Sequence, residues 1–427
     1  MLLTDEEKRM RDGAEGDAVA AAMDLLIRYA DALGAERLVE TRNVAGTMTQ
    51  PSPAKAALFA EGGWSRVYAV TNLDCDRDLD IPRMKVPTCQ LQHGFGTDAS
   101  GLTPYPDSSI ALQEDAEAFV SERGVNILAT CTPYQVGNLP VRGEHCAWME
   151  SSAVVYCNSV LGARTNCEGA ASTGAAALTG RIPYWGNHDP AQRLATHLVR
   201  ADVQVESFQD WGMLGYFVGD VVQEARPAVV GALAQPDLAD LKHFGAAAAT
   251  SGGVEMYHLP GVTPEAPDLE AAFGGASVPE ARVYDRAARR EVYEALNSQG
   301  DSDDVDFILL GCPHASLDQL AEIAQLLDGR RLHADTELWV MTPRALRSVA
   351  DRSGYTRAIT AAGGKVLTDS CPAMSRAAPP GTRVFATDSA KQAHYLPAIL
   401  GIEAWFGTLK ECIDAAVTGR WHGTLPA

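Results

Sequence analysis

The last third of the chain alternates apolar runs of strand length with helix-forming segments, and this alternation restricts the folds open to it. Residues 305–310 form an apolar run that stops at Gly311. A capped amphipathic pattern follows at 316–327, and further apolar runs at 337–341 and 365–369 are separated by a helical segment. Strands and helices that alternate at this spacing predict parallel sheets in an α/β fold.

The rest of the chain carries segments of both kinds. Apolar periodicity predicts helices over residues 14–40, 111–123, 170–178 and 238–248. Short apolar runs predict strands over residues 64–70, 125–130 and 152–156. His197 falls in a pattern that favours a helix, so we expect it to be structural.

A chain of 427 residues is long enough for two or three domains. We treat 1–427 as one catalytic unit. Within it we expect three subdomains, at 1–205, 206–300 and 301–427.

Three of the nine cysteines share one setting. Cys131, Cys312 and Cys371 each follow an apolar strand and are closely followed by a proline, which stiffens the turn. Ligands of open α/β folds bind outside the carboxyl ends of the strands. Three thiolates there can hold an iron–sulfur cluster, and an iron without a fourth protein ligand is a Lewis acid. The alternative is that these are ordinary small residues in buried turns.

A second group of candidates lies in the loop 158–166, which we expect to follow a strand. It offers two amides, two hydroxyls and a guanidinium that can bind a carboxylate or phosphate through paired hydrogen bonds. The candidate substrate-binding residues are Asn158, Ser159, Arg164, Thr165 and Asn166. A polar connecting loop is the alternative. Ser389 and Lys391 are weaker candidates, because their segment equally fits a helix N-cap.

Histidines are few, and three of them lie in turn-like contexts. These are His93, His188 and His314. His314 stands two residues after Cys312, so it could donate to a cluster sulfur or act as a general acid. Exposure to solvent is the alternative for each of them.

The charge balance excludes several partners. The net charge is −20, without a basic patch to bind nucleic acid or an anionic membrane surface. No apolar segment is long enough to span a bilayer, and the charged N-terminus lacks a signal-peptide core. Scattered cysteines, nine in number, favour a reducing compartment. We expect a cytoplasmic protein.

Several longer motifs together resemble the aconitase X family, and the resemblance runs nearly end to end. The residues that carry it are Leu3-Thr4-Asp5-Glu6-Glu7, Ala129-Thr130-Cys131-Thr132-Pro133-Tyr134, Glu150-Ser151-Ser152-Ala153, the loop 158–166, Leu310-Gly311-Cys312-Pro313-His314 and Ala416-Val417-Thr418-Gly419-Arg420-Trp421.

The resemblance implies a hydro-lyase with aconitase-like α/β/α layers. It implies an iron–sulfur cluster on Cys131, Cys312 and Cys371, with 2Fe-2S, 3Fe-4S and 4Fe-4S types all open. Members of the family dehydrate cis-3-hydroxy-L-proline or mevalonate 5-phosphate. They also use a small swivelling domain, which we expect here as a separate small subunit. The general base is typically a serine of that domain, so we expect none in this chain.

Between the two substrates the residues modestly favour cis-3-hydroxy-L-proline, which would give a pyrroline carboxylate. A phosphate would require more cationic groups than Arg164 supplies nearby. Cys167 stands where the resemblance leads us to expect a basic residue, so it could tune the pocket or bind the cluster. Two other classes remain open: a hydrolase with zinc on the same three cysteines, and a non-catalytic large subunit.

Overall fold

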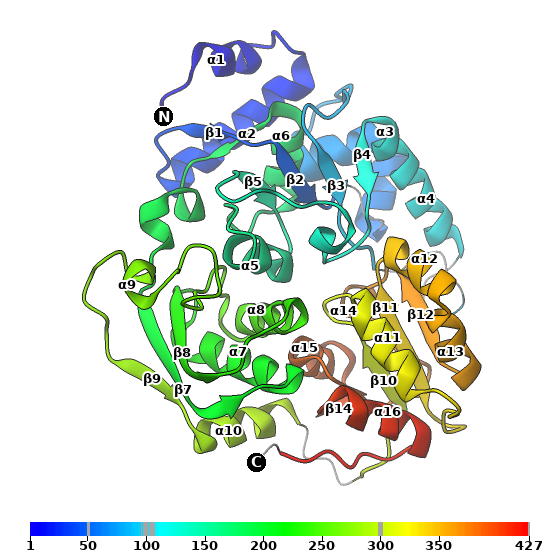
Figure 1. Ribbon diagram of the computed structural model, residues 1–427. Helices are drawn as coiled ribbons and strands as arrows, with labels where there is room; N and C mark the ends of the chain where they lie inside the picture. The colour runs from blue at the N-terminus through cyan, green and yellow to red at the C-terminus, as the bar shows by residue number, and fades with distance from the viewer. Residues whose placement is uncertain (49–51, 95, 97–100, 102–106, 298–301, 426–427) are drawn as a thin grey trace.

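The computed structural model describes the whole chain except residues 49–51, 95, 97–100, 102–106, 298–301 and 426–427. Three α/β lobes surround a common centre (Figure 1). The first is blue to teal, the second green, and the third yellow to red. Within the described ranges no helix combines the length and the apolar character that crossing a membrane requires.

The first lobe is built on a four-stranded parallel sheet in the order β4-β3-β2-β5. These strands are β2 (Asn43–Gly46), β3 (Thr88–Gln90), β4 (Val125–Ile127) and β5 (Cys146–Trp148). Its helices are α1 (Asp5–Arg11), α2 (Asp17–Leu33), α3 (Pro53–Leu73), α4 (Asp107–Glu122), α5 (Ser151–Ser159) and α6 (Ala170–Thr179). A short antiparallel pair, β1 (Leu38–Glu40) with β6 (Arg181–Pro183), closes one side.

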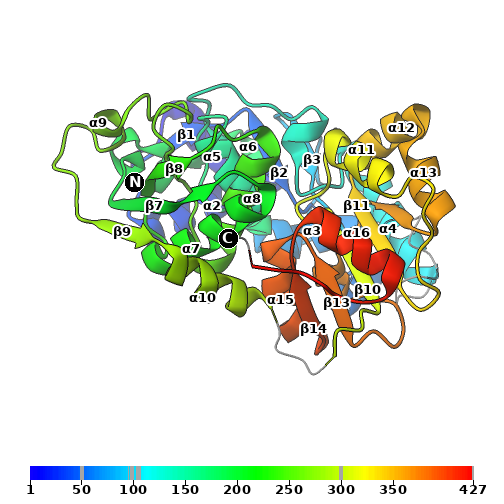
Figure 2. The ribbon, with the colours of Figure 1, turned by 60° about the horizontal axis from the view of Figure 1, so that its bottom comes forward.

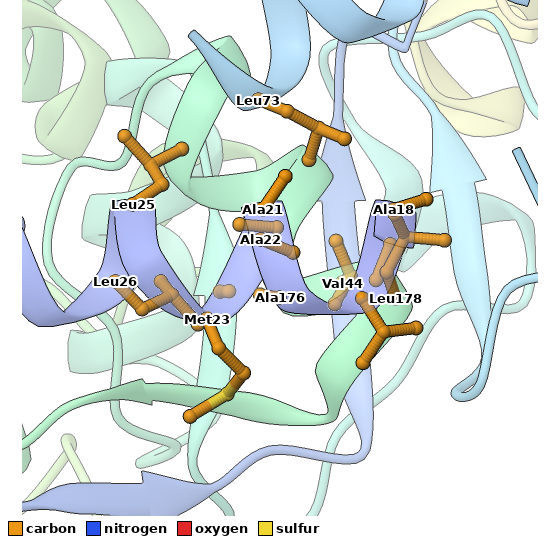
Figure 3. Packing of buried hydrophobic residues seen from close by; sticks show 14 of the residues in the cluster. Ala18, Ala21, Ala22, Met23, Leu25, Leu26, Val44, Leu73, Ala176 and Leu178 are labelled. Carbon is orange, nitrogen blue, oxygen red and sulfur yellow. The ribbon is translucent and has the colours of Figure 1, made fainter. Parts of the chain in front are cut away.

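Small side chains bring the helices of this lobe close together. Ala18, Ala21 and Ala22 of α2 are buried, and α2 packs against α6, where Ala176 is also buried (Figure 3). Larger side chains such as Leu26 fill the space beside the alanines. Alanine favours helices and leaves room for a neighbouring backbone, so this face both forms the helix and packs it.

Replacing Leu26 by alanine should therefore destabilise the fold. Leu26 is fully buried, whereas Leu33 on the same helix is 38% exposed. A Leu→Ala change in a core costs about 2–5 kcal/mol, and we expect Leu26→Ala to fall in that range. Chemical unfolding of Leu26→Ala beside Leu33→Ala measures the difference. Equal losses for the two variants would contradict the packing described here.

The second lobe holds the parallel sheet β8-β7-β9. Its strands are β7 (His197–Val205), β8 (Pro227–Leu233) and β9 (Ala281–Tyr284). Its helices are α7 (Phe208–Val222), α8 (Leu238–Gly252), α9 (Leu269–Ala272) and α10 (Arg286–Leu296). Helices α7 and α8 touch backbone to backbone, because a Cβ added at Gly252 would lie 1.9 Å from the carbonyl oxygen of Gly219. Helix α8 also packs on α5 of the first lobe.

The third lobe has a five-stranded parallel sheet in the order β12-β11-β10-β13-β14. The strands are β10 (Phe307–Leu310), β11 (Glu337–Thr342), β12 (Lys365–Thr368), β13 (Val384–Thr387) and β14 (Glu403–Phe406). The helices are α11 (Leu317–Leu326), α12 (Arg344–Ser353), α13 (Tyr355–Ala362), α14 (Pro372–Ser375), α15 (Ala390–Leu400) and α16 (Leu409–Thr418). Figure 2 shows the second and third lobes side by side, and α15 packs on α8 between them. The predicted α/β class with parallel sheets is confirmed.

Two predicted strands are helical. Residues 64–70 belong to α3, in which Trp64, Val67 and Tyr68 are buried at helical spacing. Residues 152–156 belong to α5, whose residues 152–159 are all buried. A helix buried on every side has no amphipathic period, so its sequence resembles that of a central strand.

The prediction of a helix around His197 is also wrong. This residue begins β7, and burial alternates along much of that strand, from Val199 to Val205. The alternation is the period of a half-buried strand.

Candidate active site

The three candidate ligand cysteines lie between the first and third lobes. Cys131 follows β4 of the first lobe. Cys312 follows β10, and Cys371 follows β12 and caps the start of α14. All three strands belong to parallel sheets, and each cysteine comes after the carboxyl end of its strand. The placement matches the edge at which ligands bind in such folds.

His314 joins the three cysteine loops. Its ring nitrogen Nδ1 lies 2.7 Å from Oγ1 of Thr130, and Nε2 lies 3.0 Å from the carbonyl oxygen of Ser370. Its backbone N–H donates to Sγ of Cys131 at 3.4 Å. Because the Ser370 carbonyl can only accept, Nε2 carries the proton and Thr130 donates to Nδ1.

His314 is therefore an uncharged side chain with a structural role. Burial lowers the pKa of His314 to about 4, and its side chain is 2% exposed. His314 follows Cys312 by two residues, bonds to the sulfur of Cys131, and bonds to Ser370, which precedes Cys371. It therefore holds the loops of all three cysteines together. Such hydrogen bonds orient the ligands of a metal site and are part of its construction.

Polar groups lie beside each of the three sulfurs. Cys131 accepts a hydrogen bond from the His314 N–H. The hydroxyl of Ser389 favours the thiolate of Cys312, and the backbone N–H groups of Ala373 and Met374 favour that of Cys371, so each lowers a pKa that burial raises. Donors to sulfur are typical of iron–sulfur sites, where they set the reduction potential of the cluster.

A buried ion pair stands beside the thiols. The Lys391 Nζ lies 2.6 Å from Oε1 of Glu150 and 2.8 Å from Oγ of Ser152. The two charged side chains are only 17% and 12% exposed. Glu150 has a left-handed backbone, with φ of 77°, and its Oε2 accepts from the N–H of Ala153 at the start of α5. An outlying backbone at such a place is typical of functional sites.

The charge of Lys391 is directed at the cysteines. Burial alone would lower the pKa of Lys391, but the Glu150 carboxylate and the sulfurs of Cys312 and Cys131 outweigh that effect and raise it. In turn, Lys391 favours the thiolate forms of Cys312 and Cys371. Lys391 is thus a permanent cation that offsets negative charge at this centre.

The thiols remain neutral without a metal. Burial raises the pKa of Cys312 to about 12, and it also raises the pKa of Cys131 and Cys371. Cys312 further raises the pKa of Cys131, and Cys371 that of Cys312, so the sulfurs lie within reach of one another's charge. Metal binding would ionise these thiols and release their protons.

In the part of the chain that the structure describes, no three His, Cys, Asp or Glu side chains surround one point closely enough to hold a metal ion. Two sulfurs on one tetrahedral zinc lie about 3.8 Å apart, given Zn–S bonds of about 2.3 Å. A cluster spreads its ligands over several irons. Both a zinc ion and a cluster stay open for the three thiols.

Most polar side chains of the predicted substrate-binding loop form hydrogen bonds with other groups of the protein. The loop begins in the last turn of helix α5 rather than after a strand. Asn158 donates to the carbonyl oxygens of Thr165 and Glu255 at 2.8 and 3.0 Å. Ser159 Oγ accepts from the N–H of Tyr257 at 2.9 Å. Thr165 Oγ1 accepts from Trp148 N–H.

The last amide of this loop is used in the same way. Asn166 accepts from the Asn187 N–H at 2.8 Å and donates to the Trp185 carbonyl oxygen at 3.2 Å. Asn158, Ser159, Thr165 and Asn166 are all buried. Their geometry fixes the path of the loop.

Arg193 supports this loop and was not anticipated from the sequence. It is 1% exposed, and its guanidinium pairs with Glu265 at 2.8 Å. It also donates to the carbonyl oxygens of Asn158 and Ala163. A single arginine in a turn carries no sequence signal for this role.

Arg164 is the member of the loop with unused donors. Its Nη1 makes one long hydrogen bond of 3.4 Å to the carbonyl oxygen of His188. Its Nε is buried and has no partner among the described residues. The cation also lowers the pKa of the adjacent His145, after the larger effect of burial, to about 4. Arg164 thus retains capacity to bind an anionic group.

Two carboxylates lie next to Cys167. The backbone of Cys167 pairs with Trp148, two residues before Glu150. The Cys167 N–H donates to Oε1 of Glu255 at 3.2 Å. Burial raises the pKa of Glu168 to about 7, and its Oε1 has no hydrogen-bond partner in the described chain. Cys167 is a candidate from the sequence, whereas Glu168 and Glu255 are not, because a lone Glu in a loop has no distinctive pattern.

Cys167 links these carboxylates to the thiol centre. After burial, the charges that raise the pKa of Cys167 to about 12 are those of Glu255, Glu150 and Glu168, while Lys391 lowers it. The carboxylates and the Glu150–Lys391 pair therefore border one region. Cys167 itself is exposed there.

The three candidate histidines are all buried, which excludes the solvent-exposed alternative. His93 lies 2.9 Å from Oε1 of Glu117 through Nε2. His188 shares a hydrogen bond of 2.9 Å with His145. Next to His93, the Gly94 carbonyl accepts from the N–H of Cys371, so residues 93–94 lie beside the backbone of the third cysteine. Phe95 and Thr97, part of the same sequence motif, lie outside the described residues.

Three family models match the chain in succession. They are described as the aconitase X first domain over residues 1–191, second domain over 195–294 and third domain over 305–418. In structure, the chain is similar to the crystal structure of Thermococcus kodakaraensis aconitase X in its holo-form. The TM-score is 0.79 at 32% identity, with 97% of this chain and 100% of that chain covered.

Relatives of two activities are similarly close. The phosphomevalonate dehydratase large subunit of Methanothermobacter thermautotrophicus is 38% identical, over 93% of this chain and 94% of its own. The cis-3-hydroxy-L-proline dehydratase of Pseudomonas aeruginosa is 34% identical, over 97% of this chain and 70% of its own. Both are dehydratases by name, so the comparisons agree on the reaction and divide on the substrate.

Proposed function

Since this chain belongs to the aconitase X family and is a hydro-lyase, we propose that it dehydrates cis-3-hydroxy-L-proline to a pyrroline carboxylate. Loss of water would give an enamine, which tautomerises to the cyclic imine. The proposal is supported mainly by the charges that border the thiol centre. The similar identities of relatives with either activity do not decide the substrate.

The charges near the thiols suit a zwitterion better than a phosphate ester. Arg164 keeps donors for a carboxylate, and Glu168 and Glu255 offer carboxylates to a protonated ring amine. Lys391 is already paired with Glu150. Mevalonate 5-phosphate carries a carboxylate and a phosphate, and both would face these acidic side chains. Like charges placed opposite each other disfavour a ligand by several kcal/mol.

We assign the cluster to Cys131, Cys312 and Cys371, of a type left open. When bound, it would supply a Lewis acid that makes the substrate hydroxyl a better leaving group. Lys391 offsets negative charge next to it, and His314 holds the cysteine loops in place. Arg164 binds the carboxylate, and Asn158, Ser159, Thr165 and Asn166 keep the Arg164 loop in its shape.

A small partner chain completes the proposed enzyme. Some relatives are named as large subunits, which implies a small subunit in those proteins. We propose that a swivel-type small chain covers the thiol centre here and brings the general base. This chain alone would then bind substrate without turning it over.

Turnover assays with both substrates test the proposal. The chain is co-expressed with its small partner and purified without oxygen, and each substrate is followed separately. We expect cis-3-hydroxy-L-proline to give a kcat/KM at least about a hundredfold higher, as expected for a difference near 3 kcal/mol. Glu255→Gln should raise the KM for that substrate, because it removes a carboxylate facing the amine. Turnover of mevalonate 5-phosphate alone would reject our choice of substrate.

A further inference from the structure

A cavity lies beside the His314 turn. Its volume is about 980 Å³, which is within the range of small-molecule sites. All three lobes contribute to it, through residues of 134–161, 206–242 and 316–410. Its inner wall includes Lys242 and Gln135, and both donate to the carbonyl oxygen of His314. The cavity therefore shares the His314 turn with the thiol centre, and the charge of Lys242 interacts with Cys131 and Cys312.

The floor of the cavity holds an unpaired carboxylate. Asp388 is only 5% exposed and lines the cavity. Among the described residues its carboxylate makes no hydrogen bond or ion pair with another side chain, and burial raises the pKa of Asp388 to about 7, while the nearby Lys242 lowers it. Lys242 beside it is 3% exposed and is already held by His314 and by Oε1 of Gln319 at 2.8 Å. A buried carboxylate without a partner is costly, so this arrangement favours a ligand that brings a donor.

The walls combine further carboxylates with apolar surface. Acidic side chains outnumber the two lysines that line the cavity, Lys242 and Lys410. They are Glu206, Asp237, Asp240, Asp318, Glu322 and Asp388. Between them stand the rings of Tyr134 and Tyr156, stacked with centroids 3.7 Å apart and planes 5° apart. Aromatic faces attract ammonium groups as well as methylene chains.

We propose that this cavity binds a linear polyamine. Such a molecule carries several ammonium groups separated by short methylene segments. Carboxylates line the cavity together with apolar and aromatic side chains, which suits this alternation, and one ammonium would pair with Asp388. None of the three candidate ligand cysteines lines the cavity, and binding there does not depend on which substrate the enzyme uses.

Calorimetric titration with spermidine at physiological ionic strength tests this site. We expect saturable binding with one spermidine per chain. The variant Asp388→Asn/Glu322→Gln should weaken binding at least about tenfold, because it removes two charges that face the ligand. Octane-1,8-diol, which has the methylene chain without the charges, should not bind. Circular dichroism confirms that the variant is folded.

The net charge of −20 would also attract spermidine to the surface in general, and a matched variant controls for this. Asp328→Asn/Asp335→Asn removes the same charge from exposed positions outside the cavity. Its affinity should stay within about twofold of the unmodified chain. Equal loss in both variants, or no saturable binding, overturns the proposal. So does binding to the isolated chain that disappears in the complex, because a partner segment would then fill the cavity.

Discussion

Serine in place of any one of Cys131, Cys312 or Cys371 is expected to abolish the dehydratase activity and the iron content together. Serine keeps the size of the side chain but is a poor ligand for iron, which prefers thiolates. Loss of a Lewis acid removes several kcal/mol of transition-state stabilisation. We therefore expect kcat to fall by about a thousandfold or more.

The measurement combines iron and sulfide analysis, the visible spectrum and activity on anaerobically purified complex. Cys75→Ser is the matched control, since Cys75 is only partly buried and lies in the first lobe beside its core. It should keep cluster and activity. Zinc without sulfide in the unmodified protein, or full activity in all three variants, would reject the cluster assignment.

Replacing Lys391 by methionine should lower kcat strongly while leaving the three thiols in place. The change leaves the Glu150 carboxylate, which is only 12% exposed, without its cationic partner. Breaking a buried ion pair in this way costs about 3–5 kcal/mol of stability. It also removes the cation that offsets negative charge at the thiol centre, an electrostatic effect that we expect to lower kcat by about 10²–10³-fold.

A double variant separates the two effects. Lys391→Met/Glu150→Gln removes the stranded charge, so the free energy of unfolding should recover while kcat stays low. Lys391→Arg, which keeps the charge, should retain more activity than Lys391→Met. If the double variant recovered activity along with stability, the role of Lys391 would be structural only. Iron content, followed in each variant, shows whether the loss of kcat arises with the cluster in place.

The sequence was informative where one physical signal dominates. In the third lobe, strands buried on both faces read as continuous apolar runs, and the parallel sheet follows from their alternation with helices. The turn that holds Cys312 was recognisable because a strand, a glycine and a proline surround the thiol. Helix α5 was misread, since all of its residues 152–159 are buried and a buried helix has no amphipathic period.

The candidate site was less accessible to sequence reasoning, because its parts meet only in space. Glu150 and Lys391 are 241 residues apart, and no local pattern links them. Arg193 and Glu255 are single residues in loops without a motif. Asn158 and Asn166 were noticed as polar groups in one loop, but a polar residue that binds a ligand and one that binds its own backbone look alike in a sequence.

The hydrogen bonds of His314 join segments that are far apart in the sequence, and this affects the order in which the protein folds and could load its metal. Its ring contacts Thr130, which lies 184 residues earlier, and Ser370, which lies 56 residues later. Contacts of such separation form late, after the segments that carry them have folded. The three thiols therefore come together only when the first and third lobes dock. In the proposed site, iron would therefore be loaded only after this docking, so a chain with its cluster in place would already have joined its first and third lobes.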